Sequence, residues 1–367
     1  MHLRQLAGES LIAGIEAALA GGPPVAPLCE DRLLAAVQPD QPVIEPDAAL
    51  IVPTSGTTSA PKAVVLSAAA IRFAANACHE RLGGVGDWVC ALPTQHIAGL
   101  MTITRAVVAG RSVSFARGDL ADLPDAGARS YLSLVAAQLD QGMADPVLVQ
   151  RLTGYAAVLV GGSSIRPDLL ARARASGIVA VTTYGASETC GGCVYDGVAL
   201  TGVRVELAGE RVGLGGPMAF SGYRLRPDLT AEVLHGDLVV TNDRGRLVGG
   251  RLEVLGRFDD VVISGGEKVD LVAAQRACEA EFGTVAEGGP VLLALPDQRW
   301  GHRIVAVATA EFDLGQLQAR LVPRIGRAAV PKELRQVPAM AYTSIGKIDR
   351  AALLRAWEQK GEHGEIG

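Results

Sequence analysis

No strong excess of charge of either sign is present in this sequence of 367 residues. The net charge is −5 with acids and bases mixed along the chain, so neither a nucleic acid nor an anionic membrane is expected as a partner. A membrane-spanning run is also missing, because the most apolar helix-like run, at 99–110, is short and contains Arg105. The first 22 residues are typical of an amphipathic helix and lack the apolar block of a signal peptide. The cytoplasm is therefore the expected location.

Complete metal-binding and nucleotide-binding signatures of the common kinds are missing too. Cys190 and Cys193 have CxxC spacing, but no second pair and no nearby histidine pair completes a zinc site. Reduced, structural thiols are the expected state of the six cysteines in a cytosolic chain. No Walker A pattern, internal repeat or low-complexity tract occurs.

The patterns that are present indicate an α/β protein of about two domains. Apolar strand-like runs alternate with helical patterns through the first two thirds of the chain, which predicts α/β layers with largely parallel strands. The expected strands lie at 49–52, 63–66, 88–92, 112–115, 156–160 and 178–182. The expected helices lie at 68–82, 100–109, 130–139 and 167–175.

The last third changes its pattern twice. From about Val203 short strands and Gly-rich turns predict β-hairpins, and after Gly256 a new αβ pattern begins. Its expected elements are helices at 269–282 and 314–321 and strands at 290–295 and 303–310. We therefore expect an N-terminal domain over residues 1–258 and a smaller α+β domain over residues 259–367.

A hydroxyl-rich loop, IVPTSGTTSAPK, lies between the first two of these apolar runs. Backbone N–H groups and hydroxyls in a tight turn can donate to phosphate oxygens, and a lysine adds positive charge. The candidate phosphate-binding residues are Thr54, Ser55, Gly56, Thr57, Thr58 and Lys62. An ordinary surface turn is the alternative.

Two further segments follow expected strands. LPTQHIAGL contains His96, for which a packed or helix-capping role is the alternative. TYGASET follows the strand at 178–182, and the carboxyl ends of parallel strands commonly open onto a ligand crevice. There Tyr184 could stack on a purine, Gly185 could permit close approach, and Glu188 could bind Mg²⁺. A strand-to-loop transition with a helix N-cap is the alternative.

Two segments in the last third also carry candidate residues. In TNDRGRL, Asp243 is expected in a turn, where its carboxylate could bind vicinal hydroxyls or form an Asx turn. In SIGKIDR, Lys347 follows a glycine and could equally be a solvated surface lysine.

Taken in order, these segments and GRFDDVVISGG resemble the signature motifs of the adenylate-forming superfamily, and the resemblance spans Thr54 to Arg350. It implies a large N-terminal α/β domain with a β-rich part and a small mobile C-terminal domain. The compact length and LPTQHIAGL are most similar to the o-succinylbenzoate–CoA ligases of menaquinone biosynthesis. Ser59 and Asn242 stand where that superfamily usually has glycine.

The resemblance implies a two-step ligation that uses ATP, Mg²⁺ and coenzyme A, with a small-molecule acid as substrate and a homo-oligomer left possible. The acid first forms an acyl-adenylate, and the thiol of coenzyme A then displaces AMP. The implied catalytic residues are Lys347, His96 and Glu188, the last also a Mg²⁺ ligand. The residues implied in nucleotide binding are those of the hydroxyl-rich loop (here called the phosphate loop), Tyr184, Gly185, Asp243 and Arg257. Those implied in binding the acyl group are His96, Arg105, Gly161, Gly162 and Ser163. Asp259 is implied at the hinge between the domains, and Gly265 and Gly266 are implied in the coenzyme A channel.

Arg105 is the candidate residue for substrate choice. It interrupts an otherwise uncharged run, and a buried cation needs an anionic partner. The resemblance implies that Arg105 meets a second carboxylate of the acid. The alternatives are that its charge reaches solvent or pairs with an acid of the protein.

Other functions remain open at this point. An enzyme of the same fold could activate another aryl or fatty acid, and ATP–pyrophosphate exchange over a panel of acids would distinguish these. A non-catalytic nucleotide-binding homologue would bind ATP without turnover.

Overall fold

The computed structural model describes residues 1–54, 61–342 and 348–361, and the chain divides into two compact units. The first unit contains Met1–Thr241 and Gly245–Val254, and the second contains Asn242–Arg244 and Leu255–Gly367. The main segment of the second unit begins slightly before the boundary expected at Asp259.

A seven-stranded sheet forms the centre of the first unit, in the order β11-β10-β9-β8-β7-β5-β6. The strands from β9 to β6 are parallel, whereas β10 and β11 pair antiparallel. The predicted alternation with largely parallel strands is therefore confirmed. The strands are β5 (Asp87–Cys90), β6 (Val113–Phe115), β7 (Ser130–Val135), β8 (Ala157–Gly161), β9 (Ala180–Ala186), β10 (Gly191–Tyr195) and β11 (Val198–Ala199).

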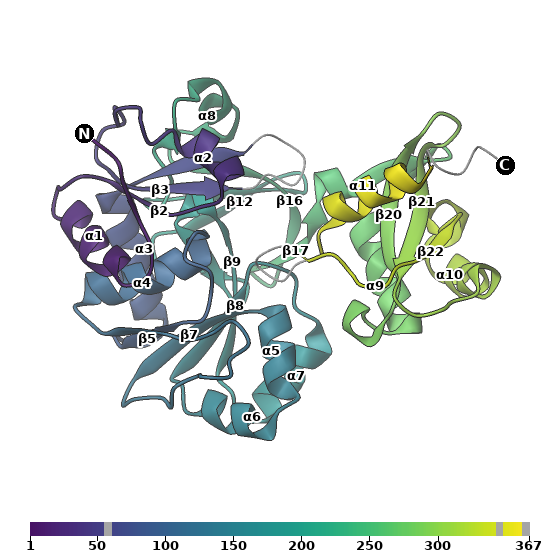
Figure 1. Ribbon diagram of the computed structural model, residues 1–367, viewed down its shortest axis with the longest axis horizontal. Helices are drawn as coiled ribbons and strands as arrows, with labels where there is room; N and C mark the ends of the chain where they lie inside the picture. Colours follow the sequence, from purple (N-terminus) through teal and green to yellow (C-terminus); the bar gives the residue numbers. More distant parts are fainter. Residues whose placement is uncertain (55–60, 343–347, 362–367) are drawn as a thin grey trace. The chain divides into compact units, whose positions relative to one another are not determined.

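Helices cover both faces of this sheet. On one face, Leu132 and Leu134 of β7 pack in a cluster with residues of α5 (Ala136–Met143), α6 (Pro146–Thr153) and α7 (Pro167–Ala175), which lie together in Figure 1. On the other face, Tyr131 packs with residues of α3 (Ala68–Arg81) and α4 (Ile97–Ala109). Side chains alternate along the strand, as the pleat requires.

The prediction of one helix over 130–139 is wrong. Ser130–Val135 forms the strand β7, and the helix α5 begins only at Ala136. A strand covered on both faces is nearly continuously apolar, and periodicity cannot separate such a run from a buried helix.

A five-stranded sheet, β1-β2-β3-β4-β14, forms a second layer of the first unit. One side packs against α1, α3 and α4 and the other against α2, so each face is apolar. The amphipathic helix expected at the N-terminus begins only at Ser10, after β1. The elements are β1 (Arg4–Leu6), α1 (Ser10–Leu19), β2 (Val25–Pro27), α2 (Asp31–Val37), β3 (Ala48–Thr54), β4 (Lys62–Ser67) and β14 (Gly222–Tyr223).

The segment expected to be β-rich forms a third sheet, in the order β12-β13-β16-β15, with β17 paired to β16. Its elements are β12 (Arg204–Ala208), β13 (Arg211–Gly215), α8 (Pro227–Val233), β15 (Leu234–His235), β16 (Leu238–Val248) and β17 (Arg251–Arg257). Gly249 and Gly250, both with positive φ, make the turn between β16 and β17.

The second unit contains a sheet in the order β19-β18-β21-β20, with β22 paired to β21. Helices α9 and α10 pack against one face of this sheet. Helix α11 packs against the alternate strand residues, which form the other face. No helix of the described ranges is long and apolar enough to cross a membrane. The elements are β18 (Val261–Ser264), β19 (Glu267–Asp270), α9 (Leu271–Phe282), β20 (Val291–Asp297), β21 (Gly301–Ala308), α10 (Leu314–Ala329), β22 (Leu334–Gln336) and α11 (Arg350–Gly361).

The six cysteines form no disulfides, and all except Cys29 are buried. Burial raises the pKa of Cys90 to about 11 and that of Cys193 to about 12. These thiols therefore behave as small apolar groups of the core.

Leu134→Ala tests the position of β7 in the core. Because Leu134 is only 1% exposed, its truncation should lower the free energy of unfolding by about 2–5 kcal/mol. Val179→Ala is the control, because the Val179 side chain is 50% exposed and its loss should change stability by less than about 0.5 kcal/mol. Urea unfolding of both variants measures the difference, and equal stabilities would contradict the burial of Leu134.

Candidate functional site

The carboxyl ends of β8 and β9 bring several predicted residues together. Gly161 ends β8, and a Cβ atom placed there would lie 2.3 Å from Oγ1 of Thr183. Only glycine permits this approach of the two strands without a shift of Thr183. Gly162 follows with a φ of +78°, and Ser163 is exposed. Of the predicted acyl-binding residues in this segment, Gly161 therefore lies against β9, whereas a Cβ atom on Gly162 would contact Val135 of β7.

The TYGASET segment begins inside β9 instead of after it, because β9 runs to Ala186. Tyr184 is half-buried and packs against the hydrophobic core. A Cβ atom on Gly185 would lie 2.0 Å from the carbonyl oxygen of Gly191 in the neighbouring strand β10. Gly185 is thus required by the pairing of β9 with β10, in addition to any role toward a ligand.

Glu188 lies in the 3₁₀ turn η1 (Ser187–Thr189) and accepts a hydrogen bond from Tyr223. The Tyr223 hydroxyl donates to Oε1 of Glu188 at 2.6 Å. The Nζ atom of Lys62 lies 4.9 Å from the centroid of the same tyrosine ring. Tyr223 therefore connects the lysine of the predicted phosphate loop to the predicted Mg²⁺ ligand.

The two ends of the phosphate loop are held together by strand pairing. Thr54 ends β3 and lies opposite Lys62, the first residue of β4. The hydroxyl of Thr54 donates to the carbonyl oxygen of Lys62 at 3.2 Å. The predicted residues Ser55, Gly56, Thr57 and Thr58 lie outside the described residues, as does Lys347.

His96 is the residue that precedes helix α4. Its backbone is extended and its side chain makes no capping hydrogen bond to the helix, whereas its carbonyl oxygen accepts from the N–H of Leu100. The side-chain capping alternative is therefore not what the structure shows. His96 lies at the end of α4 that is nearest, along the chain, to the carboxyl end of β5.

Arg105 lies in the third turn of α4 and is only 5% exposed. Its guanidinium packs over the ring of Trp88, 5.1 Å from the ring centroid. Burial lowers the pKa of Arg105, but the Tyr195 hydroxyl and the thiols of Cys78 and Cys190 raise it, and the net pKa lies above its ordinary value. It forms no ion pair with an acid of the described residues, and its Nε atom has no hydrogen-bond partner among them.

Two of the predicted ribose-binding residues are neighbours in the second unit. Nη1 of Arg257 lies 3.9 Å from a carboxylate oxygen of Asp243, and Nη2 lies 3.2 Å from Asp259. The expectation that Asp243 sits in a turn is wrong, because it lies within the strand β16. The strand continues through this position because β17 pairs along it, and the turn is formed by Gly249 and Gly250.

Gly265 and Gly266 form the two-residue turn between β18 and β19. Their φ values of +60° and +83° are typical of a hairpin turn in which both central residues are left-handed. The turn itself therefore explains both glycines, and their predicted place in a coenzyme A channel stays a prediction.

The sequence profile of a family described as AMP-binding enzyme matches residues 12–248, well over half of the chain. The chain belongs to this family. A protein of Mycobacterium tuberculosis (strain H37Rv) named "Probable 2-succinylbenzoate--CoA ligase" is 40% identical over 94% of both chains. An Enterococcus faecalis protein named "2-succinylbenzoate--CoA ligase" is 28% identical over 82% of this chain and 68% of its own length.

Solved structures share the fold of this AMP-binding enzyme. A structure of Escherichia coli MenE with bound OSB-AMS has a TM-score of 0.78 and 23% identity, and the match covers 98% of this chain and 88% of that one. A Bacillus subtilis o-succinylbenzoate CoA synthetase in complex with OSB-AMP has a TM-score of 0.72 and 20% identity, over 95% and 82% of the two chains. The adenylate-forming fold predicted from the motifs is therefore confirmed.

Sequence reasoning missed Tyr223 and its neighbour Arg224. The strand β14 that carries Tyr223 has only two residues, too few to leave a periodic pattern. The partner of Tyr223, Glu188, lies 35 residues away in the sequence. The pairing of β14 with β4, together with a hydrogen bond from the N–H of Phe220 to the carbonyl oxygen of Glu188, brings these residues together.

The described residues contain no cluster of three or more His, Cys, Asp or Glu that could hold a metal ion. A single carboxylate such as Glu188 nevertheless fits Mg²⁺, which keeps several waters and takes other ligands from substrate phosphates. The donor set of the AMP-binding enzyme thus allows Mg²⁺ to bind together with a nucleotide.

Asp243→Ala tests the nucleotide-binding prediction for this family member. The loss of a charged acceptor to two ribose hydroxyls should weaken AMP binding by about 2 kcal/mol, or about 30-fold. Asp228→Ala is the control, because Asp228 is exposed and pairs with Arg226. Calorimetric titration measures both affinities, and an unchanged affinity of Asp243→Ala would show that Asp243 does not bind the nucleotide.

Proposed function

We propose that this AMP-binding enzyme is an ATP-dependent o-succinylbenzoate–CoA ligase of menaquinone biosynthesis. The observation that carries the proposal is the 40% identity with the Mycobacterium tuberculosis relative over nearly the full length of both chains. Relatives with the same activity in their names occur in Enterococcus faecalis and Escherichia coli. The enzyme would work in the cytoplasm, where ATP and coenzyme A are available.

In the first step a carboxylate oxygen of the acid attacks the α-phosphorus of ATP, and pyrophosphate leaves. Negative charge develops on phosphoryl oxygens, so positioned donors are the main requirement. Thr54, the hydroxyls of the phosphate loop and Lys62 would bind the β- and γ-phosphates. The pairing of Thr54 with Lys62 supports this role, because it brings the two ends of the loop next to each other.

Other residues would position the nucleotide. Tyr184 would stack on the adenine, with Gly185 beside it, and Glu188 would bind Mg²⁺, which neutralises phosphate charge when bound. Asp243 would accept hydrogen bonds from the ribose hydroxyls. The 3.9 Å separation of Asp243 and Arg257 supports a shared role, because the guanidinium can orient the carboxylate toward the ribose.

In the second step the sulfur of coenzyme A attacks the carbonyl carbon of the acyl-adenylate, and AMP leaves. Lys347 would bind the acid and the α-phosphate in the first step alone, and the C-terminal domain would then turn about Asp259. His96, Gly161, Gly162 and Ser163 would line the acyl pocket. The glycine pair at 265 and 266 would line the coenzyme A channel, where the missing side chains allow the ligand to approach the backbone.

The direct test is thioester formation with o-succinylbenzoate, benzoate and a medium-chain fatty acid. We expect o-succinylbenzoyl-CoA to form with by far the highest kcat/KM. A higher kcat/KM for another acid would assign the enzyme to that acid, and ATP binding without turnover on any acid of the panel would exclude a ligase.

Lys347→Ala separates the two steps. We expect it to abolish ATP–pyrophosphate exchange while leaving thioester formation from pre-made acyl-adenylate within about two-fold of wild type. Lys332→Ala is the control, because Lys332 also lies in the second unit but donates to the backbone of Arg327. Equal loss of both steps in Lys347→Ala would contradict a role restricted to the first.

The surroundings of Arg105 support its proposed role in recognising the second carboxylate of o-succinylbenzoate. Its side chain does not reach solvent, and no described acid neutralises it. Burying a charge is costly unless an opposite charge or hydrogen bonds compensate. The substrate carboxylate would supply that partner directly or through a water, and the packing on Trp88 would hold the guanidinium in place.

Arg105→Ala should therefore raise the KM for o-succinylbenzoate and leave the KM for ATP near normal. The loss of one charge-assisted pair corresponds to about 1.5–3 kcal/mol, or about 10- to 150-fold. An analogue without the succinyl carboxylate should have a high KM with the wild-type enzyme. Arg105→Ala should not raise the KM for this analogue further. If both substrates bind more weakly by the same factor, Arg105 is structural.

A further inference from the structure

A partly buried hydrogen bond joins Tyr223 to Glu188, a residue of the predicted nucleotide site. Tyr223 is only 6% exposed, and its hydroxyl donates to Oε1 of Glu188 at 2.6 Å. The tyrosine hydroxyl is the donor of this hydrogen bond, and the carboxylate of Glu188 is the acceptor.

This hydrogen bond engages one of the two carboxylate oxygens. Among the described residues Glu188 makes no other side-chain hydrogen bond, so Oε2 has no described partner. A carboxylate with one oxygen fixed by a hydrogen-bond donor has a defined orientation. Such an arrangement suits a carboxylate that has to meet a cation with its second oxygen.

The ring of Tyr223 is itself held in place from several sides. Phe220 packs edge-on at 5.0 Å between ring centroids, and Lys62 lies over the ring. The backbone N–H of Tyr223 donates to Oγ1 of Thr230 at 2.8 Å, and β14 pairs with β4 at Val64. The hydroxyl position is thus defined by the same strand β4 that begins with Lys62.

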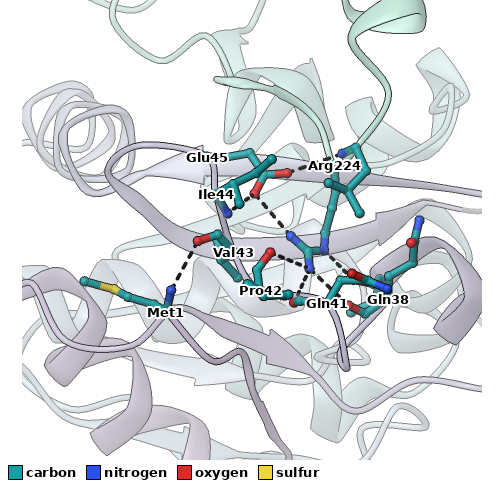
Figure 2. Close-up of polar contacts among 10 residues, drawn as sticks. Met1, Gln38, Gln41, Pro42, Val43, Ile44, Glu45 and Arg224 are labelled. Carbon is teal, nitrogen blue, oxygen red and sulfur yellow. Dashed lines mark hydrogen bonds and ion pairs between the residues drawn. The ribbon is translucent and has the colours of Figure 1, made fainter.

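The next residue, Arg224, fixes β14 to the N-terminal part of the chain. Its side chain is 1% exposed, and Figure 2 shows its guanidinium surrounded by acceptors of the segment between α2 and β3. Nη1 forms an ion pair with Glu45 at 3.1 Å. The backbone oxygens that accept from Arg224 are those of Val37 (2.6 Å), Gln38 (3.0 Å), Gln41 (2.7 Å) and Pro42 (3.5 Å).

We propose that Tyr223 is a positioning residue that orients the carboxylate of Glu188 toward Mg²⁺ of the bound nucleotide, and that Arg224 holds the strand that carries it. The proposal rests on the proposed function only in that Glu188 meets Mg²⁺ and ATP. By this proposal, the short strand β14 helps to determine how much Mg²⁺ increases the affinity for the nucleotide.

Tyr223→Phe is the decisive variant, because it removes the hydroxyl and keeps the ring beneath Lys62. Calorimetric titration of ATP with and without Mg²⁺ gives the factor by which Mg²⁺ tightens ATP binding. We expect this factor to fall about tenfold in Tyr223→Phe, the size typical of losing one hydrogen bond to a charged acceptor. Affinity for ATP without Mg²⁺ should change by less than about two-fold.

Tyr155→Phe is the matched control. Tyr155 is also buried in the first unit, and its hydroxyl donates at 2.6 Å, but to the backbone oxygen of Pro124. Its removal should leave the Mg²⁺ factor unchanged. In a Glu188→Gln background, Tyr223→Phe should change the factor by less than about two-fold, because the acceptor charge is already absent.

The outcomes separate the inference from the proposed function. An unchanged Mg²⁺ factor in folded Tyr223→Phe overturns the inference, whatever acid the enzyme uses. The same holds if Tyr223→Phe and Tyr155→Phe lower the factor equally, because the effect would then be general damage. Failure to form o-succinylbenzoyl-CoA while Mg²⁺ still tightens ATP binding would instead overturn the substrate assignment alone.

Discussion

The buried charge of Arg224 is the constraint on which the arrangement around the phosphate loop depends. A guanidinium inside a protein is tolerated only where hydrogen bonds and an opposite charge replace its water. Arg224 obtains these from Glu45 and from four backbone oxygens, all more than 170 residues earlier in the chain. The segment 37–45 therefore cannot be removed without leaving a buried cation. Through Val43, which pairs with Met1, the same segment also fixes the start of the chain.

Arg224 also matters for the predicted nucleotide site, because β14 is short. A strand of two residues makes too few backbone hydrogen bonds to hold its position. The hydrogen bonds and the ion pair of the neighbouring Arg224 provide the additional attachment. The fixed strand then places Tyr223 between Lys62 and Glu188. The contacts of Arg224 on one side of the five-stranded sheet thereby help to define the position of the Tyr223 hydroxyl, which donates to Glu188.

Much of the fold and part of the candidate site could be predicted from the sequence. Strand–helix alternation indicated the layers, and motif order indicated the family and named both Asp243 and Arg257, which lie 3.9 Å apart. The strand β7 could not be predicted, because burial on both faces removes the period that separates strand from helix. Tyr223 and Arg224 could not be found, because SGYRLRP looks like a polar turn and their partners are far away in the chain. That no acid of the described residues pairs with Arg105 also became visible only with the surrounding core in place.

The distribution of thiols has a practical consequence for fluorescence experiments that follow the distance between the two units of this enzyme. Five cysteines are buried, and burial raises the pKa of Cys90, Cys190, Cys193 and Cys278. Cys29 alone is partly exposed, and its pKa is raised by partial burial and then by Glu30 and Asp31, so alkylation there is slow but selective. The natural chain thus offers one attachment point for a maleimide dye in its first unit. One cysteine added to the surface of the second unit would complete a donor–acceptor pair for single-molecule fluorescence, with no native thiol to remove.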